Sequence, residues 1–202
     1  MRVCQEKVKE FFDQLAPGWD AGRETHPERI EAILDRAEIG PGCAVLDAAC
    51  GTGVLFPYCL RRGVRQLTGA DLSGEMIRIA RERCRDPRLR LLEGDVLKVA
   101  RGSYDRIIVF NALPHFPDPE GLLAALGGWL TPGGRLTVAH DKSRLAINGH
   151  HQRTASLVSM GLAPAEETAE LFPGWMTVDR VEEDDTHYLV SGRAPEEGRN
   201  LR

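Results

Sequence analysis

The sequence lacks the features that mark several classes of protein. No run of its 202 residues approaches the roughly 18–20 consecutive apolar side chains that a membrane-spanning helix requires. The first residues alternate charged with apolar side chains, so they lack the apolar core of a secretory signal, and we expect a cytoplasmic protein. Internal repeats and low-complexity linkers are also missing. With 42% hydrophobic and 28% charged residues, the composition is that of an ordinary globular protein.

Paired cysteines and excess positive charge are missing as well. The five cysteines are odd in number and form no C-x-x-C pair, so reduced thiols are expected rather than disulfides or a zinc site. The net charge of −4 gives no general attraction to a phosphate backbone. A basic run over residues 78–90 is interpreted as a solvated helix face, whose cations complement the carboxyl end of the helix dipole.

Strand and helix signals alternate along the chain. We expect strands over 44–47, 66–70, 89–92, 104–110 and 135–140, with helices over 54–62, 73–84 and 119–130 and a turn at 131–134. Such alternation predicts an α/β fold of one domain over 1–202, a Rossmann-like, doubly wound and mostly parallel sheet. An N-terminal helical cap over 1–37, a lid helix over 143–160, a short helix over 165–171 and an antiparallel terminal hairpin (176–181 with 186–190) complete the expected architecture. Ligands of such sheets bind at the carboxyl ends of the strands.

A glycine loop follows the first expected strand. Residues 45–53 (VLDAACGTG) place the carboxylate of Asp47 at the strand end, and small residues then allow the backbone to turn tightly against a ligand. A dinucleotide site would need a third glycine, but Phe56 occupies that position. Asp47 would also repel a pyrophosphate, whereas it can attract an ammonium group. The loop therefore favours a cationic ligand without phosphate, although a dinucleotide site or a purely structural loop remain alternatives.

Two further carboxylates end the next two strands. Asp71 can accept hydrogen bonds from both hydroxyls of a ribose, or it can cap the following helix, a role open also to Ser73. Leu72 and Met76 would then face an adenine. Asp95 is positioned to accept the adenine amino group, with the Val96 amide available to a ring nitrogen; taken alone, this segment could be a simple turn.

These residues resemble the class I S-adenosylmethionine-dependent methyltransferases. Residues 45–53 are similar to that family's glycine motif, 69–77 (GADLSGEMI) to its acidic motif, 92–96 (LEGDV) to its adenine motif and 104–136 to its fourth and fifth strands. Residues 11–20 (FFDQLAPGWD) further resemble the N-terminal segment of the ubiquinone/menaquinone C-methyltransferase subgroup. Two departures stand out: Ala49 replaces the family's first glycine, and 140–153 (HDKSRLAINGHHQR) does not match the quinone enzymes.

The resemblance implies S-adenosylmethionine as cofactor and methyl transfer as the reaction. The expected cofactor-binding residues are Trp19, Asp47, Ala49, Gly51, Thr52, Gly53, Asp71, Leu72, Met76, Asp95, Val96 and Asn111. The sequence Asn111-Ala112-Leu113-Pro114 lacks the Asn/Asp-Pro-Pro-aromatic loop with which relatives methylate adenine or glutamine nitrogen. It therefore argues against a DNA or glutamine N-methyltransferase.

Histidines are the candidate catalytic residues. His140 ends the fifth expected strand beside Asp141, His115 follows the fourth, and His150 lies on the expected lid helix. A pKa near neutrality suits a histidine to act as a general base. The same histidines could instead be polar surface or helix contacts, or could hold a metal with a carboxylate, although we expect no metal.

We expect the substrate to be a small-molecule methyl acceptor and the protein to be a monomer or a homodimer. Neither a membrane nor a nucleic acid is an expected partner. RNA or protein methylation is the alternative, and only the arginines of 61–65 and 78–90 favour it. A third reading is a non-catalytic protein that binds S-adenosylmethionine.

Overall fold

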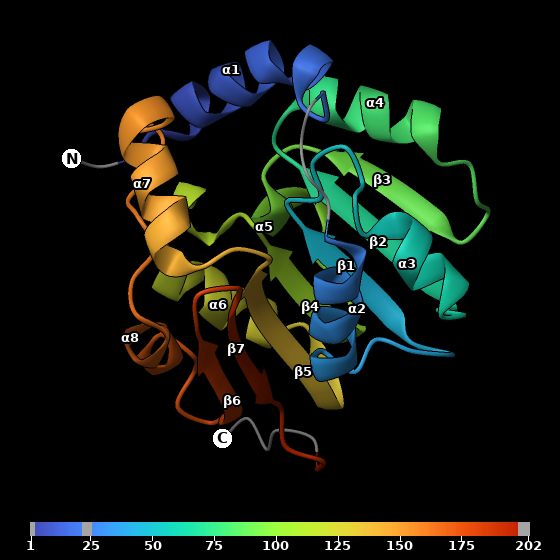
Figure 1. Ribbon diagram of the computed structural model, residues 1–202. Coiled ribbons are helices and arrows are strands. Elements are labelled where there is room, and N and C mark those ends of the chain that lie inside the picture. Colours follow the sequence, from blue (N-terminus) through green and yellow to red (C-terminus); the bar gives the residue numbers. More distant parts are fainter. Residues whose placement is uncertain (1–2, 22–25, 198–202) are drawn as a thin grey trace.

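A single sheet organises the part of the chain that the structure describes, residues 3–21 and 26–197 of a computed structural model. In this part, seven strands lie in the order β3-β2-β1-β4-β5-β7-β6, with β7 antiparallel to both of its neighbours (Figure 1). The strands are β1 (Ala44–Ala48), β2 (Gln66–Asp71), β3 (Leu89–Glu93), β4 (Tyr104–Phe110), β5 (Leu130–His140), β6 (Thr177–Glu183) and β7 (Tyr188–Arg193). The expected α/β class, the mostly parallel sheet and the antiparallel terminal hairpin are confirmed.

Helices cover both faces of this sheet. They are α1 (Gln5–Leu15), α2 (Pro27–Arg36), α3 (Phe56–Arg61), α4 (Gly74–Arg83), α5 (Val96–Val99), α6 (Pro119–Gly127), α7 (Arg144–Thr154) and α8 (Ala165–Glu170), with short 3-10 turns η1 (Ala16–Gly18) and η2 (Leu113–His115). Along β4, Ile107 packs into a core with α6, whereas its neighbour Ile108 packs into a second core with α2 and α3. This alternation is the two-residue period of a strand that is buried on both faces.

The central position of β1 brings the carboxyl ends of several strands together. All five of its residues are buried, and it pairs in parallel with β2 on one side and with β4 on the other. Parallel strands joined by helical crossovers end at the same edge of the sheet, so the loops that follow β1, β2, β3 and β4 converge there. No described helix is long and apolar enough to cross a membrane.

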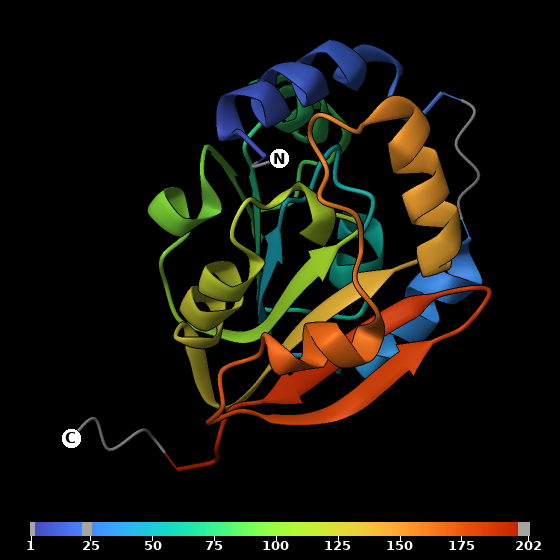
Figure 2. The same cartoon turned by 90° about the vertical axis from the view of Figure 1, so that its left-hand side faces the viewer.

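Helix α1 lies across this edge as a roof, as both ribbon views show (Figures 1 and 2). Val3 and Val8 form a small buried cluster with Ala155 and Val158, which follow α7. Asp13 on α1 accepts a hydrogen bond of 2.6 Å from the Ser73 hydroxyl at the start of α4. The N-terminal segment thus contacts both the start of α4 and the segment that follows α7.

Helix α2 does not share in this roof. Its buried residues Ile30, Ile33 and Leu34 pack against a face of the sheet, in the same core as Val45 of β1. The expected cap over 1–37 is therefore divided between a roof (α1) and a helix that covers the sheet.

Two other expectations need correction. Residues 131–134, expected as a turn, belong to β5, where the register with β4 shifts from Tyr104 opposite Leu130 to Arg106 opposite Arg135. The extra residues form a bulge, and Gly133 adopts a φ of 68°. Helix α7 ends at Thr154 rather than at 160, and residues 155–163 form an irregular segment that packs back onto η2.

A buried aromatic ring, that of Phe56, stands where the dinucleotide-binding motif has its third glycine. The Phe56 ring is fully buried, and a Cβ added at Gly53 would lie 2.4 Å from it. A Cβ added at Gly69 of β2 would lie 2.7 Å from the same ring and 3.0 Å from the Cys50 sulfur. Phe56 thus packs between the loop and β2 because both glycines lack side chains.

We predict that Gly69→Ala lowers the free energy of unfolding by about 1–3 kcal/mol, because the new methyl group overpacks a rigid site. Urea denaturation would measure this loss. The loss should shrink in a Phe56→Leu background, where the clashing edge of the ring is missing. Gly40→Ala is the control, since nothing lies within 4 Å of an added Cβ there. An equal loss from Gly69→Ala in both backgrounds would contradict the packing argument.

Candidate functional site

The loop after β1 turns sharply in three steps of left-handed backbone. Ala49, Gly51 and Gly53 have φ values of 100°, 54° and 87°. The amides of Ala49 and Cys50 both donate to the Ala70 carbonyl of β2, at 2.8 and 3.0 Å. These bonds close the turn and bring its backbone to the wall of a pocket at the strand ends.

Ala49 is the unusual member of this loop. Ala49 has a φ of 100°, which residues other than glycine rarely adopt. Backbone strain of this kind typically costs about 1–3 kcal/mol. Ala49 lines the pocket. The departure from glycine noted in the sequence therefore falls where the backbone conformation favours glycine most.

Asp47 is a buried carboxylate without a partner. It is 2% exposed, and neither of its oxygens has a hydrogen-bond partner among the described residues. Burial, with a smaller contribution from the nearby Asp71, raises the pKa of Asp47 to about 8. Since Asp47 lines the pocket, a cationic group bound there would supply the missing partner.

Asp71 holds the glycine loop and the start of α4 together. Its two oxygens accept hydrogen bonds from the amides of Gly51 and Ser73, at 2.8 and 2.9 Å. Burial raises the pKa of Asp71 to about 6, although these amides act in the opposite direction. Each carboxylate oxygen can accept a further hydrogen bond, so the carboxylate can still receive two hydroxyl groups from a ligand. Ser73 caps α4, as its hydroxyl accepts from the Met76 amide.

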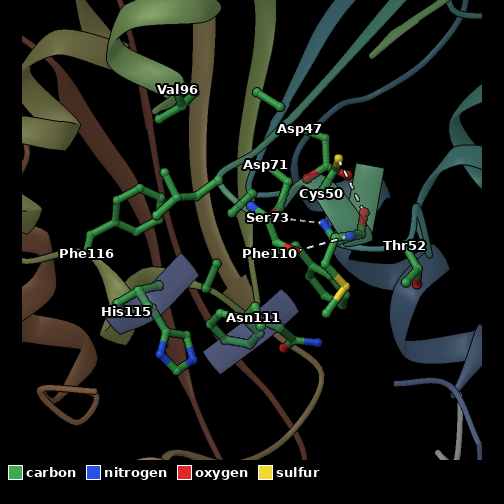
Figure 3. Close-up of a pocket in the computed structure, with 18 of the residues that line it drawn as sticks. Asp47, Cys50, Thr52, Asp71, Ser73, Val96, Phe110, Asn111, His115 and Phe116 are labelled. Carbon is green, nitrogen blue, oxygen red and sulfur yellow. Dashed lines mark hydrogen bonds between the residues drawn. The ribbon is translucent and has the colours of Figure 1, made fainter. Parts of the chain in front are cut away.

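The remaining predicted cofactor residues are gathered around this pair. Leu72, Met76 and Val96 give the pocket an apolar wall, and Asp95 caps α5 by accepting from the Leu97 amide. All predicted cofactor residues line the pocket except Gly53, whose missing side chain makes room for the Phe56 ring instead. Figure 3 shows Asp47, Cys50 and Thr52 on one side of the pocket and Phe116 and His115 on the other.

The segment after α1 closes the pocket on the side of the glycine loop. Thr52 donates a hydrogen bond of 3.2 Å to Asp20, which also pairs with Arg83 of α4. The Trp19 ring packs edge-to-face on Phe12, with ring centroids 5.5 Å apart. The indole nitrogen of Trp19 lies 3.9 Å from the position of a Cβ at Gly51. Residues far apart in sequence therefore enclose one cavity.

Asn111 and Asp141 join the ends of β4 and β5. The Asn111 amide nitrogen donates to the Asp141 carboxylate at 3.0 Å, and its amide oxygen accepts from the Asp141 backbone at 3.2 Å. Asn111 has a φ of 54°, a conformation that asparagine tolerates better than most residues. Both side chains line the pocket.

The histidines separate in the structure. His115 on η2 lines the pocket, whereas His140 and His150 do not. His140 is 1% exposed and packs edge-to-face on Tyr188, its neighbour across the β5–β7 ladder, and burial lowers its pKa to about 3. His150 is exposed on α7. The pocket lining therefore does not support a contact of these two histidines with substrate, which stays a prediction. No group of three or more potential metal ligands occurs in the described residues.

Several pocket residues were not predicted. Phe12 and Asp20 arrive from the N-terminal segment, Cys50 from the glycine loop, Phe110 from β4 and Lys142 from the segment after β5. The sequence carried one signal for the first two, the resemblance of residues 11–20. Cys50 and Phe110 lie within segments that carried the resemblance, although neither residue was singled out, and nothing in the local pattern indicated Lys142.

Most of the arginines that favoured nucleic acid are paired. Arg61 and Arg62 contact Glu31, and Arg65 contacts Asp105. In the second basic run, Arg78 pairs with glutamates of its own helix, Arg83 with Asp20 and Arg88 with Asp86. These cations therefore serve largely in contacts within the protein.

Known proteins are similar to this chain in sequence and in fold. Residues 45–134 match the family described as "Methyltransferase domain". A ubiquinone biosynthesis O-methyltransferase of Xanthomonas euvesicatoria is 30% identical over 181 residues, which cover 84% of this chain and 70% of that protein.

Solved structures agree on the fold. The N-methyltransferase NodS from Bradyrhizobium japonicum, solved with S-adenosyl-L-homocysteine, has a TM-score of 0.71 at 17% identity, covering 95% of this chain and 98% of NodS. The [4+2]-cyclase SpnF has a TM-score of 0.76 at 15% identity, covering 98% of both chains. With the matching family model and the 30% identical relative, the chain belongs to the class I S-adenosylmethionine-dependent methyltransferases.

We predict that the stability of the ligand-free protein falls as the pH rises from 6.5 to 8. Asp47 has a pKa of about 8 in the folded chain and near 4 in the unfolded chain. Between these values unfolding releases the proton of Asp47, so a rise in pH favours the unfolded state. The expected loss is about 1–2 kcal/mol in urea denaturation. His140 and His151, two histidines whose pKa values are lowered, titrate mainly below this pH range.

Asp47→Asn should remove most of that slope, because the amide does not ionise. Asp118→Asn is the control, since Asp118 is an exposed helix cap outside the pocket and asparagine also caps helices well. A wild-type slope in Asp47→Asn would contradict the assignment.

Proposed function

We propose that the pocket binds S-adenosylmethionine and that the protein transfers its methyl group to a small-molecule acceptor, releasing S-adenosylhomocysteine. The observation that carries this proposal is the buried Asp47 carboxylate, which lacks a partner among the described residues and lines the pocket. An ionised carboxylate in such a place needs a cation. The α-ammonium group of the cofactor supplies one.

The other residues of the pocket fit the rest of the cofactor. Asp71 has acceptor capacity left for two ribose hydroxyls after binding the Gly51 and Ser73 amides. Leu72 and Met76 offer apolar contact to an adenine ring. The bound cofactor supplies a methyl group already activated by its sulfonium, so the protein has chiefly to position an acceptor beside it.

The far side of the pocket has the character of an acceptor site. Phe12 and Phe116 line it with aromatic rings, and His115 and Lys142 add polar groups. The names of the relatives include both an O-methyltransferase and an N-methyltransferase, and the cyclase shares the fold, so the comparisons leave the methylated atom open. The enclosure beneath α1 suits a small molecule better than an RNA or protein chain. Residues 143–160 would act with α1 to enclose the acceptor.

We predict that Asp47→Asn weakens binding of S-adenosylmethionine by about 10–100-fold in calorimetry, the effect of losing one charge-assisted hydrogen bond. Methylthioadenosine, which lacks the ammonium and carboxylate groups, is the matched ligand, and its affinity should change little. Asp71→Asn should weaken both ligands, because both carry the ribose hydroxyls. An equal loss of the two ligands in Asp47→Asn would show that this variant damages the pocket generally, and no binding of S-adenosylmethionine by the wild type would exclude the proposal.

We also predict that the protein transfers labelled methyl groups to a low-molecular-weight compound. Metabolite extract, total RNA and denatured protein would each be incubated with methyl-labelled cofactor, and the labelled product would be identified by mass spectrometry. Label in the RNA or protein fraction alone would contradict a small-molecule acceptor. Tight cofactor binding without label in any fraction would favour a binding protein without catalysis.

A further inference from the structure

One polar side chain on the acceptor side of the pocket has a defined protonation state. The Nδ1 atom of His115 lies 2.8 Å from the backbone carbonyl oxygen of Val158. A carbonyl oxygen can only accept a hydrogen bond, so Nδ1 carries the proton. Burial lowers the pKa of His115 below its usual value, which keeps the ring neutral at physiological pH. The Nε2 atom therefore bears a free lone pair.

The surroundings hold the His115 ring in place. Phe12 on α1 packs edge-to-face against it with centroids 4.9 Å apart, and His151 on α7 lies 4.8 Å away on a tilted plane. The Met160 amide donates to the Pro114 carbonyl at 2.9 Å, which fastens the segment after α7 to η2 beside His115. Val158 itself is buried against α1. The carbonyl that selects the tautomer is thus fixed from both sides.

Three other potential bases of the pocket are engaged within the protein, and the proposed function assigns Asp47 to the ammonium group of the cofactor. Asp141 accepts a hydrogen bond from Asn111, Asp20 binds Thr52 and Arg83, and Lys9 pairs with Asp13. Of the described residues that line the pocket, His115 alone is a histidine. It is therefore the group best suited to take a proton from a bound acceptor.

We propose that His115 is the general base of the reaction and that the acceptor is a hydroxyl group on a planar, conjugated ring. This inference rests on the proposed function. A neutral imidazole assists a nucleophile that arrives protonated, as a hydroxyl does, and adds little for an acceptor that is already a free amine. The aromatic walls formed by Phe12 and Phe116 select a flat ring.

The proton and electron balance of the step is complete without another reactant. The acceptor oxygen bonds to the methyl carbon while the carbon–sulfur bond breaks and leaves its electron pair on sulfur. The hydroxyl proton passes to Nε2 of His115, while Nδ1–H continues to donate to the Val158 carbonyl. The proton then leaves to water, which restores the neutral ring.

The first test compares His115→Asn with wild type on the labelled product. We expect a methyl ether of a phenol or enol, and a rate lowered by about 100–10,000-fold in His115→Asn, the usual contribution of a general base. His26→Asn is the matched control, because His26 caps α2 outside the pocket and asparagine is a good cap. Calorimetry should give the same affinity for S-adenosylhomocysteine in all three proteins, which shows that His115→Asn is folded.

The second test reads the tautomer directly and needs no acceptor. Nitrogen NMR of the protein with bound S-adenosylhomocysteine should show His115 protonated at Nδ1 and not at Nε2. A proton on Nε2, or undiminished turnover by His115→Asn, would overturn the role of His115. A labelled amine, thioether or carbon product would overturn the inference while the proposed function stands. Absence of any labelled small molecule would overturn both.

Discussion

The arrangement of the site depends on one carboxyl group, that of Asp47, which the fold buries without a hydrogen-bond partner among the described residues. Asp47 stands at the end of the central strand β1, which has sheet on both sides and helices on both faces, so neither solvent nor a described side chain reaches its oxygens. Only the ligand pocket is open to it. In the sharp turn that follows, the Gly51 amide donates its hydrogen bond to Asp71 and not to Asp47. The oxygens of Asp47, which lack a hydrogen-bond partner among the described residues, therefore lie where a cationic ligand is expected.

Much of the fold and the cofactor side of the site could be predicted because its signals are local. A strand that ends in a carboxylate and runs into small residues specifies Asp47, Gly51 and their neighbours within ten positions of sequence. Asp71 and Asp95 follow the same rule at the next two strand ends. Because the carboxyl ends of parallel strands share one edge of the sheet, these three carboxylates are expected to lie close together.

The side of the pocket that we propose for the acceptor was predicted less well because it is assembled over long separations in sequence. The sequence indicated that His140 closes β5, but not that Tyr188 of the antiparallel β7 would cover it. The pattern of a strand shows that successive side chains point to opposite faces of the sheet. It does not show which of these faces a segment distant in sequence will cover. The helix expected to reach 160 stops at Thr154, and that early end frees the Val158 carbonyl to bind His115.

The roof over the pocket has a consequence for how ligands come and go. Its apolar contact joins Val3 and Val8 to Ala155 and Val158, segments about 150 residues apart in a chain of 202. Such a contact forms late in folding, since closing so long a loop is entropically costly, and a patch of this size contributes little to global stability. A local opening would break this apolar contact and the Asp13–Ser73 hydrogen bond, and it would leave the sheet intact. Exchange of cofactor would then need only this partial opening.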